Sequence, residues 1–286
     1  MKAELEGTGN YRVLTRLCPP GPTPAPADAR IALYVDVETT GLDPKRDEII
    51  ELAMAPFYYL PSGEIVGAGE PYSALRQPSS SIPPAITELT GITDEMVAGR
   101  SIDVDEVASF AAGASLVIAH NATFDRRFLE RLSDVFSTKP WACSMTEVPW
   151  IEEGYESLKL SHLAMERGFF YERHRALADC QAAIELLSQK LPRSGEIAFS
   201  RLLANARRPV VRIFAENSPF ELKDRLKERG YRWNGEIGTA PRCWYVDVSE
   251  DQKHSEMRFL QSEIFACEID LVTRNLTAYD RYSDRC

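Results

Sequence analysis

The chain has 286 residues, of which 44% are hydrophobic and 27% charged, and its formal net charge is −10. This length allows one sizeable core and a small second domain, and the composition is typical of soluble globular proteins. There is no run of eighteen apolar residues, and the first ten residues lack the apolar core of a signal peptide. We therefore expect no membrane partner. The negative charge also argues against a protein that coats duplex nucleic acid, since such proteins are usually basic.

The cysteines of the chain are scattered rather than paired in the Cys-x-x-Cys spacing that binds zinc. Isolated cysteines fit a reducing cytosol better than a secreted disulfide framework. We therefore expect a cytoplasmic protein. The six positions are Cys18, Cys143, Cys180, Cys243, Cys267 and Cys286.

The first thirty residues contain the segment Pro19-Pro-Gly-Pro-Thr-Pro-Ala-Pro26. This density of proline is incompatible with a packed core and is typical of stiff, extended chain. We predict that residues 1–29 form a flexible, proline-rich tail.

An apolar strand with two carboxylates follows at residues 31–41. Side chains two apart on a strand point to the same face, so Asp36 and Glu38 should project together. Buried carboxylates are costly unless a cation lies between them, and oxygen ligands favour Mg²⁺ or Mn²⁺. This pair predicts a metal site, with a solvated strand end as the alternative.

The next segments alternate between strands and helices. Two apolar runs, 49–60 and 64–69, flank the turn 61–63 and predict a hairpin. Three antiparallel strands followed by alternating helices and strands predict an α/β mixed sheet flanked by helices. The later elements are expected at residues 105–112 (helix), 115–119 (strand), 123–136 (helix), 141–145 (strand), 157–168 (helix) and 175–190 (helix).

Two of these helices carry further acidic residues. Asp125 lies in the first turn of the helix at 123–136, and Asp179 borders the apolar stripe of the helix at 175–190. His174 stands five residues before Asp179. With Asp36 and Glu38, this makes four carboxylates and one histidine, a set that suits a two-metal site for cleaving phosphodiesters.

At this point the sequence resembles the DnaQ-like 3′–5′ exonucleases, which have an Asp-Glu-Asp-Asp signature and a catalytic histidine. The resemblance covers roughly residues 30–190. It rests on four segments: Val35-Asp-Val-Glu-Thr-Thr-Gly-Leu42, Ile82-Pro-Pro-Ala-Ile-Thr-Glu-Leu-Thr-Gly-Ile-Thr-Asp-Glu-Met96, His120-Asn-Ala-Thr-Phe-Asp125 and His174-Arg-Ala-Leu-Ala-Asp179.

The resemblance implies a ribonuclease-H-like exonuclease domain at residues 30–192. It also implies two Mg²⁺ ions, replaceable by Mn²⁺, with His174 as the general base. The implied metal ligands are Asp36, Glu38, Asp125 and Asp179, which are also the catalytic acids. Asp36 would be shared by both ions, because it stands on the central strand.

Further residues are expected to contact substrate. The resemblance implies that Thr39, Thr40 and Leu42 cradle the terminal nucleotide, whereas Asn121 either holds a turn or meets a phosphate. His120 is expected to pack the same turn. Arginines beside the motifs could meet phosphates, although arginines on amphipathic helices are usually only solvated. These are Arg126, Arg127, Arg173 and Arg175.

The expected substrates are 3′ ends of single-stranded nucleic acid, DNA rather than RNA. A DNA polymerase or another replication or repair protein is a possible partner. Two alternatives remain open at this stage. One is an exoribonuclease that trims RNA or degrades oligonucleotides. The other is a non-catalytic nucleic-acid-binding scaffold, which predicts a lost carboxylate, yet all four are present.

The C-terminal part is expected to form a linker helix at 193–207 and a small α+β domain at 208–286. Its arginines alternate with aromatic residues around Trp233 and Trp244. This pattern predicts either a stacking surface for single strands or the packing of a hairpin. The expected elements are 210–215 (strand), 219–229 (helix), 234–241 (hairpin), 243–248 (strand), 251–265 (helix) and 267–273 (strand).

Overall fold

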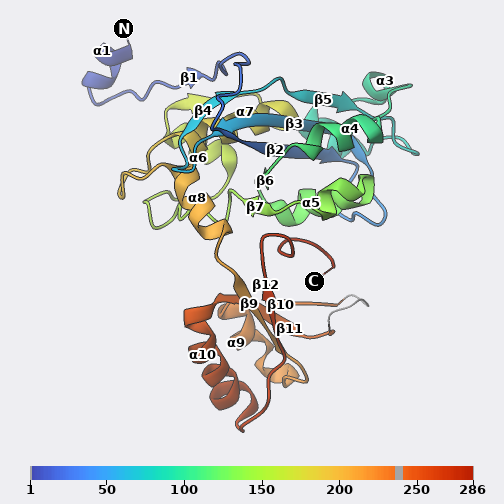
Figure 1. Ribbon diagram of the computed structural model, residues 1–286, viewed down its shortest axis with the longest axis vertical. Coiled ribbons are helices and arrows are strands. Elements are labelled where there is room, and N and C mark those ends of the chain that lie inside the picture. The colour runs from blue at the N-terminus through green and yellow to red at the C-terminus, as the bar shows by residue number, and fades with distance from the viewer. Residues whose placement is uncertain (1, 236–240, 286) are drawn as a thin grey trace. The chain divides into compact units, whose positions relative to one another are not determined.

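The computed structural model describes residues 2–235 and 241–285, and the chain divides into two compact units, residues 1–205 and 206–286 (Figure 1). Within the described residues, no helix is both long and apolar enough to cross a membrane. The five cysteines in the described part of the chain are all free thiols.

The first unit is built on a six-stranded mixed sheet in the order β4-β3-β2-β6-β7, with β5 paired to β3. β3 is antiparallel to its neighbours, whereas β6 is parallel to both β2 and β7. β2 is central because apolar side chains cover both of its faces. The strands are β2 (Arg30–Thr39), β3 (Ile49–Tyr59), β4 (Ile65–Ala68), β5 (Tyr72–Leu75), β6 (Leu116–Ala119) and β7 (Trp141–Cys143).

Helices flank this sheet. α7 packs against β2 and β3, and α5 packs against β2, β6 and β7 (Figure 1). A mixed sheet covered by helices confirms the predicted fold class. The helices are α2 (Pro84–Thr90), α3 (Asp94–Val97), α4 (Val104–Ala112), α5 (Ala122–Leu132), η1 (Asp134–Ser137), α6 (Leu160–Glu166), α7 (Ala176–Ser188) and α8 (Ala198–Ala206).

The helix α8, which falls in the expected linker, belongs to the core of the first unit over most of its length. The ring of Phe199 is fully buried and lies edge-on to Phe57 and Tyr59 of β3, with ring centroids 5.1 and 5.0 Å apart. The segment 193–207 is therefore more than a spacer, because its aromatic side chain completes the packing on the sheet.

The expected N-terminal tail is partly structured. α1 (Lys2–Gly7) is a short exposed helix, and β1 (Thr15–Arg16) pairs in parallel with β8 (Phe169–Phe170). The amide of Leu17 also donates to the carbonyl of Phe170 at 2.9 Å. The prediction of a flexible tail is thus wrong at residues 15–17, which precede the prolines and keep the amide groups that a strand needs. The proline-rich segment itself has no regular secondary structure.

The second unit has a four-stranded antiparallel sheet in the order β10-β11-β9-β12. With one helical segment after β9 and another after β11, this is a split β-α-β arrangement. Its core joins Val211 and Ile213 of β9 to Leu226, Leu260 and Ile264 of the helices. The elements are β9 (Val210–Ala215), η2 (Phe220–Leu222), α9 (Lys223–Glu228), β10 (Arg232–Trp233), β11 (Trp244–Ser249), α10 (Glu250–Phe259), η3 (Leu260–Phe265) and β12 (Thr273–Leu276).

The last strand was expected at 267–273 but begins at Thr273, because Ala266 adopts a left-handed conformation that turns the chain away after η3. Glu268 and Asp270 in that turn are exposed. The hairpin expected at 234–241 joins β10 to β11, but residues 236–240 lie outside the described part of the chain.

Candidate active site

The face of β2 that carries Asp36 and Glu38 is the centre of the site. Both side chains are half-buried on the same face, as the alternation of the strand predicts. Asp179 of α7 reaches the same place, so that ligand oxygens of Asp36, Glu38 and Asp179 all lie within 4.8 Å of one another. Residues 143 positions apart in the sequence thus meet at one point of the fold.

The start of α7 determines where the carboxylate of Asp179 points. The hydroxyl of Tyr171 donates to one of its oxygens at 2.8 Å, and the amide of Arg175 donates to the other at 3.2 Å. The next residue, Cys180, is buried and its thiol faces the carbonyl of Tyr34 on β2 at 3.7 Å. The helix is therefore anchored on the central strand beside Asp179.

Asp125 reaches the site from the other helix. It lies in the first turn of α5, is only 2% exposed, and accepts a hydrogen bond from the amide of Val37 at 3.2 Å. Its carboxylate is outside the group of three defined by the 4.8 Å limit. Burial raises the pKa of Asp125 to about 8, although the hydrogen bond from Val37 opposes this shift.

Burial and mutual repulsion strongly perturb the other carboxylates. Burial raises the pKa of Glu38 to about 8, with further contributions from Asp179 and Glu51. The pKa of Asp36 is also raised, first by burial and then by the charges of Asp125 and Asp179. Hard oxygen ligands that repel one another in a half-buried site are the donor set that Mg²⁺ or Mn²⁺ requires. The residues present therefore fit a divalent metal.

His174 lies in the bend before α7. It is half-buried and has a φ of 59°, in the left-handed region that side chains other than glycine rarely adopt. Such a conformation costs about 1–3 kcal/mol and occurs preferentially at functional sites. Burial raises the pKa of the Asp179 carboxyl, whereas the hydrogen bond from Tyr171, the electrostatic interaction with His174 and the backbone amide of His174 oppose this shift.

Glu51 is a candidate functional residue that was not predicted from the sequence. It stands on β3 directly opposite Glu38 in the strand register and is only 2% exposed. Its carboxylate binds the guanidinium of Arg175 at 3.0 Å and the amide of Ala176, the first residue of α7, also at 3.0 Å. Glu51 therefore holds the start of α7 against the sheet. The only sequence feature that could have indicated a special role for Glu51 is its charge within the otherwise apolar run 49–55.

The segment after β2 forms a tight bend. The hydroxyl of Thr39 donates to the carbonyl of Gly41 at 2.6 Å, and the hydroxyl of Thr40 donates to Asp47 at 3.3 Å. A Cβ atom at Gly41 would lie 2.5 Å from an oxygen of Asp47, so a larger residue there would displace the Asp47 carboxylate from the bend. Leu42, at the tip, is 82% exposed. The bend thus presents an apolar side chain to solvent beside the carboxylates.

The motif around His120 contains one residue that packs and one that is exposed. The His120 ring is bound on one side by the hydroxyl of Ser144 at 2.9 Å and on the other by the carbonyl of Leu158 at 2.7 Å. Burial lowers the pKa of this imidazole. Asn121 has a left-handed φ of 75° and makes no capping hydrogen bond through its side chain. The backbone of Asn121 makes the turn, while its amide side chain faces outward.

The arginines beside the motifs differ in their surroundings. Arg126 is fully buried, where it binds Glu130 at 2.7 Å and lies over the ring of Trp141. Its guanidinium therefore serves the core rather than a phosphate. The guanidinium of Arg175 is already bound to Glu51, whereas Arg173 is exposed.

A mixed α/β domain that gathers carboxylates on its central strand defines a class of metal-dependent nucleases. The family model described as "Exonuclease" matches residues 33–187. The chain belongs to this family, whose members with these motifs are the DnaQ-like 3′–5′ exonucleases.

Curated relatives share the same part of the chain. It is 35% identical over 158 residues to the PolC-type DNA polymerase III of Clostridium perfringens, which covers 53% of this chain and 10% of that protein. It is 28% identical over 162 residues to the DNA polymerase III subunit epsilon of Treponema pallidum, covering 54% of this chain and 73% of that subunit. The chain thus spans about a tenth of the PolC-type polymerase. A solved structure of exonuclease X in complex with 5′ overhanging duplex DNA aligns with a TM-score of 0.45 at 26% identity, covering 61% of this chain and 99% of the other.

Proposed function

We propose that this protein removes nucleotides from the 3′ ends of single-stranded DNA and releases 5′-mononucleotides. The observation that carries this proposal is the meeting of Asp36, Glu38 and Asp179 within 4.8 Å on two separate elements. A member of an exonuclease family that retains all four acidic residues of the motifs is equipped for hydrolysis. A scaffold without activity would have no need to keep such mutually repelling carboxylates buried together.

The four acidic residues are suited to hold two divalent ions. In this proposal Asp36 would be the shared ligand, Glu38 and Asp179 would complete the shell of one ion, and Asp125 would hold the second. When bound, such ions stabilise the charge on the attacking and leaving oxygens of an in-line displacement. The raised pKa values of Glu38 and Asp125, each about 8, mean that these carboxyls carry protons at neutral pH that cations would displace.

His174 is the general base in this proposal. An imidazole has an unperturbed pKa near neutrality and can take a proton from the attacking water at physiological pH. The side chain projects from a left-handed bend whose amides donate to Asp179. These contacts support a histidine that stands beside the carboxylates and is not itself a ligand of the metal ions.

The bend 39–42 supports the binding of the terminal nucleotide. The backbone of Thr39 lies beside Glu38, where a 3′-hydroxyl could be recognised, and Thr40 keeps the bend closed through Asp47. The exposed Leu42 offers an apolar surface to a base. At the start of α5, the side chain of Asn121 makes no capping hydrogen bond and is available to a phosphate. DNA is favoured over RNA because the relatives reported above are DNA polymerase III proteins.

Digestion of labelled strands tests the proposal. DNA and RNA oligonucleotides, single- and double-stranded, would be labelled at either end and incubated with Mg²⁺, Mn²⁺ or EDTA. We expect metal-dependent release of 5′-mononucleotides from 3′ ends, fastest on single-stranded DNA. Faster digestion of RNA would instead support the exoribonuclease alternative. A protein that binds strands but cleaves none, with any metal, would support the scaffold.

The relatives also suggest a partner. Because they are a DNA polymerase and a polymerase subunit, we propose that this protein acts beside a DNA polymerase or a repair protein. Co-purification with a polymerase from cells at endogenous abundance would support this. Full activity in cells lacking any such association would argue for a stand-alone nuclease.

A further inference from the structure

A row of aromatic rings and lysines lies on the surface of the second unit. It begins at η2, follows one face of α9 and ends on the neighbouring strands β11 and β10. We call these residues the aromatic–lysine strip. In order along the strip, they are Phe220, Lys223, Lys227, Trp244 and Trp233.

The members of the strip lie next to one another in this order. The ammonium group of Lys223 is 4.0 Å from the centroid of the Phe220 ring, and that of Lys227 is 5.9 Å from the centroid of Trp244. The rings of Trp244 and Trp233 have centroids 5.6 Å apart and planes inclined by 63°. The two lysines are four residues apart on α9, so they share one face of the helix, about 6 Å apart along its axis. The strip is therefore continuous.

The rings at the two ends of the strip are largely exposed. Phe220 is 72% exposed and Trp233 is 53% exposed. Trp244, between them, is half-buried and packs against the core of the unit. Leaving apolar rings in water is unfavourable, and an exposed apolar surface with polar neighbours is typical of a binding site. The strip therefore has the character of a surface that a ligand covers.

The charge of Lys227 can be transferred to an anionic ligand. Its ammonium group lies 3.6 Å from the carboxylate of Asp224, but the two side chains are 56% and 72% exposed, so water screens this pair. Arg225 and Arg229 of the same helix are bound to glutamates of other elements at 2.6 and 2.9 Å. A phosphate that replaces Asp224 at Lys227 therefore breaks no buried ion pair.

We propose that the aromatic–lysine strip binds a single strand of nucleic acid. Bases stack on the open faces of Phe220 and Trp233, and backbone phosphates contact Lys223 and Lys227. The candidate catalytic residues all lie in the first unit, so this site contributes to the affinity for a strand and takes no part in hydrolysis. The inference goes beyond the proposed function, because a strand can bind here whatever the active site does to it.

The alternation of rings and lysines favours a strand over other macromolecules. Sites that bind single strands without regard to sequence combine aromatic rings, which stack on any base, with cations that follow the backbone. The cores of protein–protein interfaces are also rich in aromatic residues, but lysine is depleted there. A duplex fits less well, because its bases are already stacked on one another and are not open to the rings.

Fluorescence anisotropy tests the contribution of the rings. A labelled 12-nucleotide DNA strand would be titrated with the full-length protein in EDTA, so that hydrolysis does not contribute. Phe220→Ala and Trp233→Ala each remove one exposed ring. Tyr11→Ala, which removes a 60% exposed ring from the first unit, is the matched control. We expect each strip variant to bind about 5- to 20-fold more weakly than the control, with an unchanged salt slope because no cation is lost.

Lys227→Gln tests the electrostatic contribution. It should lower the salt slope by about 0.7, the value for one phosphate contact on a single strand. Lys190→Gln removes the same charge from an exposed position outside the strip and should leave the slope unchanged. Phe220→Ala and Lys227→Gln keep the test decisive if the loss of Trp233, which packs on Trp244, disturbs the sheet.

Two results would overturn the proposal. The first is strip variants that bind the strand as tightly as Tyr11→Ala, even if the protein is an active exonuclease; if these variants instead lose a co-purifying protein, the strip is a protein interface. The second is an equal loss of affinity for a blunt duplex, because paired bases cannot stack on the rings. Conversely, weakened strand binding in a protein that hydrolyses nothing would support the strip and contradict only the proposed function.

Discussion

Replacing Glu38 with glutamine should stabilise the metal-free protein at neutral and alkaline pH. Burial, Asp179 and Glu51 raise the pKa of Glu38 from 4.5 to about 8 in the folded protein. Between these values the folded state keeps a proton that the unfolded state has lost. The stability contributed by this group is therefore complete below pH 4.5 and is lost as the pH rises through 8. Glutamine carries no such cost, since it remains neutral.

The size of the effect follows from the same two pKa values. The pKa of this group in the unfolded chain is about 2.5 units below pH 7. Keeping the proton in the folded state therefore lowers the free energy of unfolding of the wild type by roughly 3 kcal/mol, a cost that the glutamine variant does not have. For a unit of 205 residues, this corresponds to a rise in melting temperature of roughly 6–12 °C. At pH 4 the two proteins should melt together, because Glu38 is then protonated in both states.

The assay is thermal unfolding followed by circular dichroism in EDTA at pH 4, 7 and 8. Glu48→Gln is the matched control, because hydrogen bonds from Ser79 lower the pKa of Glu48 and the same substitution should there slightly reduce stability. Millimolar Mg²⁺ at pH 8 should stabilise the wild type by mass action, and much less so the Glu38 variant. A glutamine variant that melts at or below the wild-type temperature at pH 7 would refute the electrostatic argument.

Three further outcomes are expected. Asp36→Ala should abolish hydrolysis and keep the fold, and it should raise the melting temperature of the metal-free protein because a repelling charge is removed; wild-type turnover would contradict the assignment of Asp36 as the shared metal ligand. His174→Ala should keep metal binding but lose about 10²–10⁴-fold in rate at pH 7, with partial recovery at alkaline pH, and an unchanged rate would show that the histidine is structural. Deletion of residues 208–286 should leave mononucleotide release from short strands intact, since every catalytic motif precedes Leu191. A truncated protein that is folded but inactive would contradict this division into domains. Dissociation constants for short and long strands at two salt concentrations would show whether the deleted unit binds DNA.

Much of the candidate site could be predicted from local sequence. Alternation along an apolar strand was sufficient to place Asp36 and Glu38 on one face, and the stripe of α7 was sufficient to leave Asp179 at its border. These are local regularities, because strand and helix periods determine which side chains share a face. The aromatic residues of β10 and β11 show where local pattern is less informative. Trp233 lies edge-on to Trp244 and is still 53% exposed, so both packing and a free surface are present.

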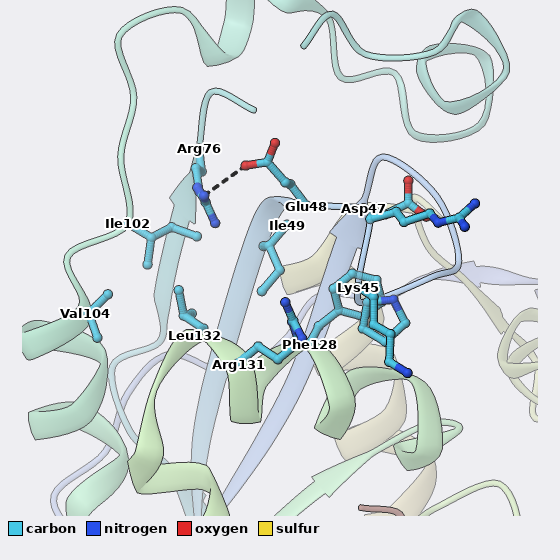
Figure 2. A pocket seen from close by; sticks show the side chains of 12 residues that line it. Lys45, Asp47, Glu48, Ile49, Arg76, Ile102, Val104, Phe128, Arg131 and Leu132 are labelled. Atoms are coloured by element: carbon cyan, nitrogen blue, oxygen red, sulfur yellow. Dashed lines mark hydrogen bonds and ion pairs between the residues drawn. The ribbon is translucent and has the colours of Figure 1, made fainter. Parts of the chain in front are cut away.

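The pocket beside the bend that follows β2 could not be predicted in this way (Figure 2). Its rim joins Lys45, Arg76 and Arg131, which are distant in sequence and belong to three different segments. Lys45 and Arg131 are exposed and Arg76 is half-buried. They line one pocket only because β3 pairs with β2 and β5 and α5 packs against the same sheet. Similarly, the position of the last strand in the second unit was predicted wrongly, because it depends on the left-handed conformation of Ala266. Alanine rarely adopts this conformation, so the sequence does not indicate it.

Glu51 shows why a motif describes less than a site. Standing opposite Glu38, it adds negative charge where charge is already costly, and it raises the pKa of Glu38. Its compensation comes from Arg175, 124 residues later, which also lowers the pKa of Glu38. The pair therefore does two things at once: it ties the start of α7 to β3, and it places a fixed cation beside the carboxylates. Because Arg175 immediately follows His174, the same contact constrains the bend that carries the proposed base. The position of the histidine thus depends on an ion pair between a buried carboxylate and a partly exposed guanidinium, which no local pattern contains.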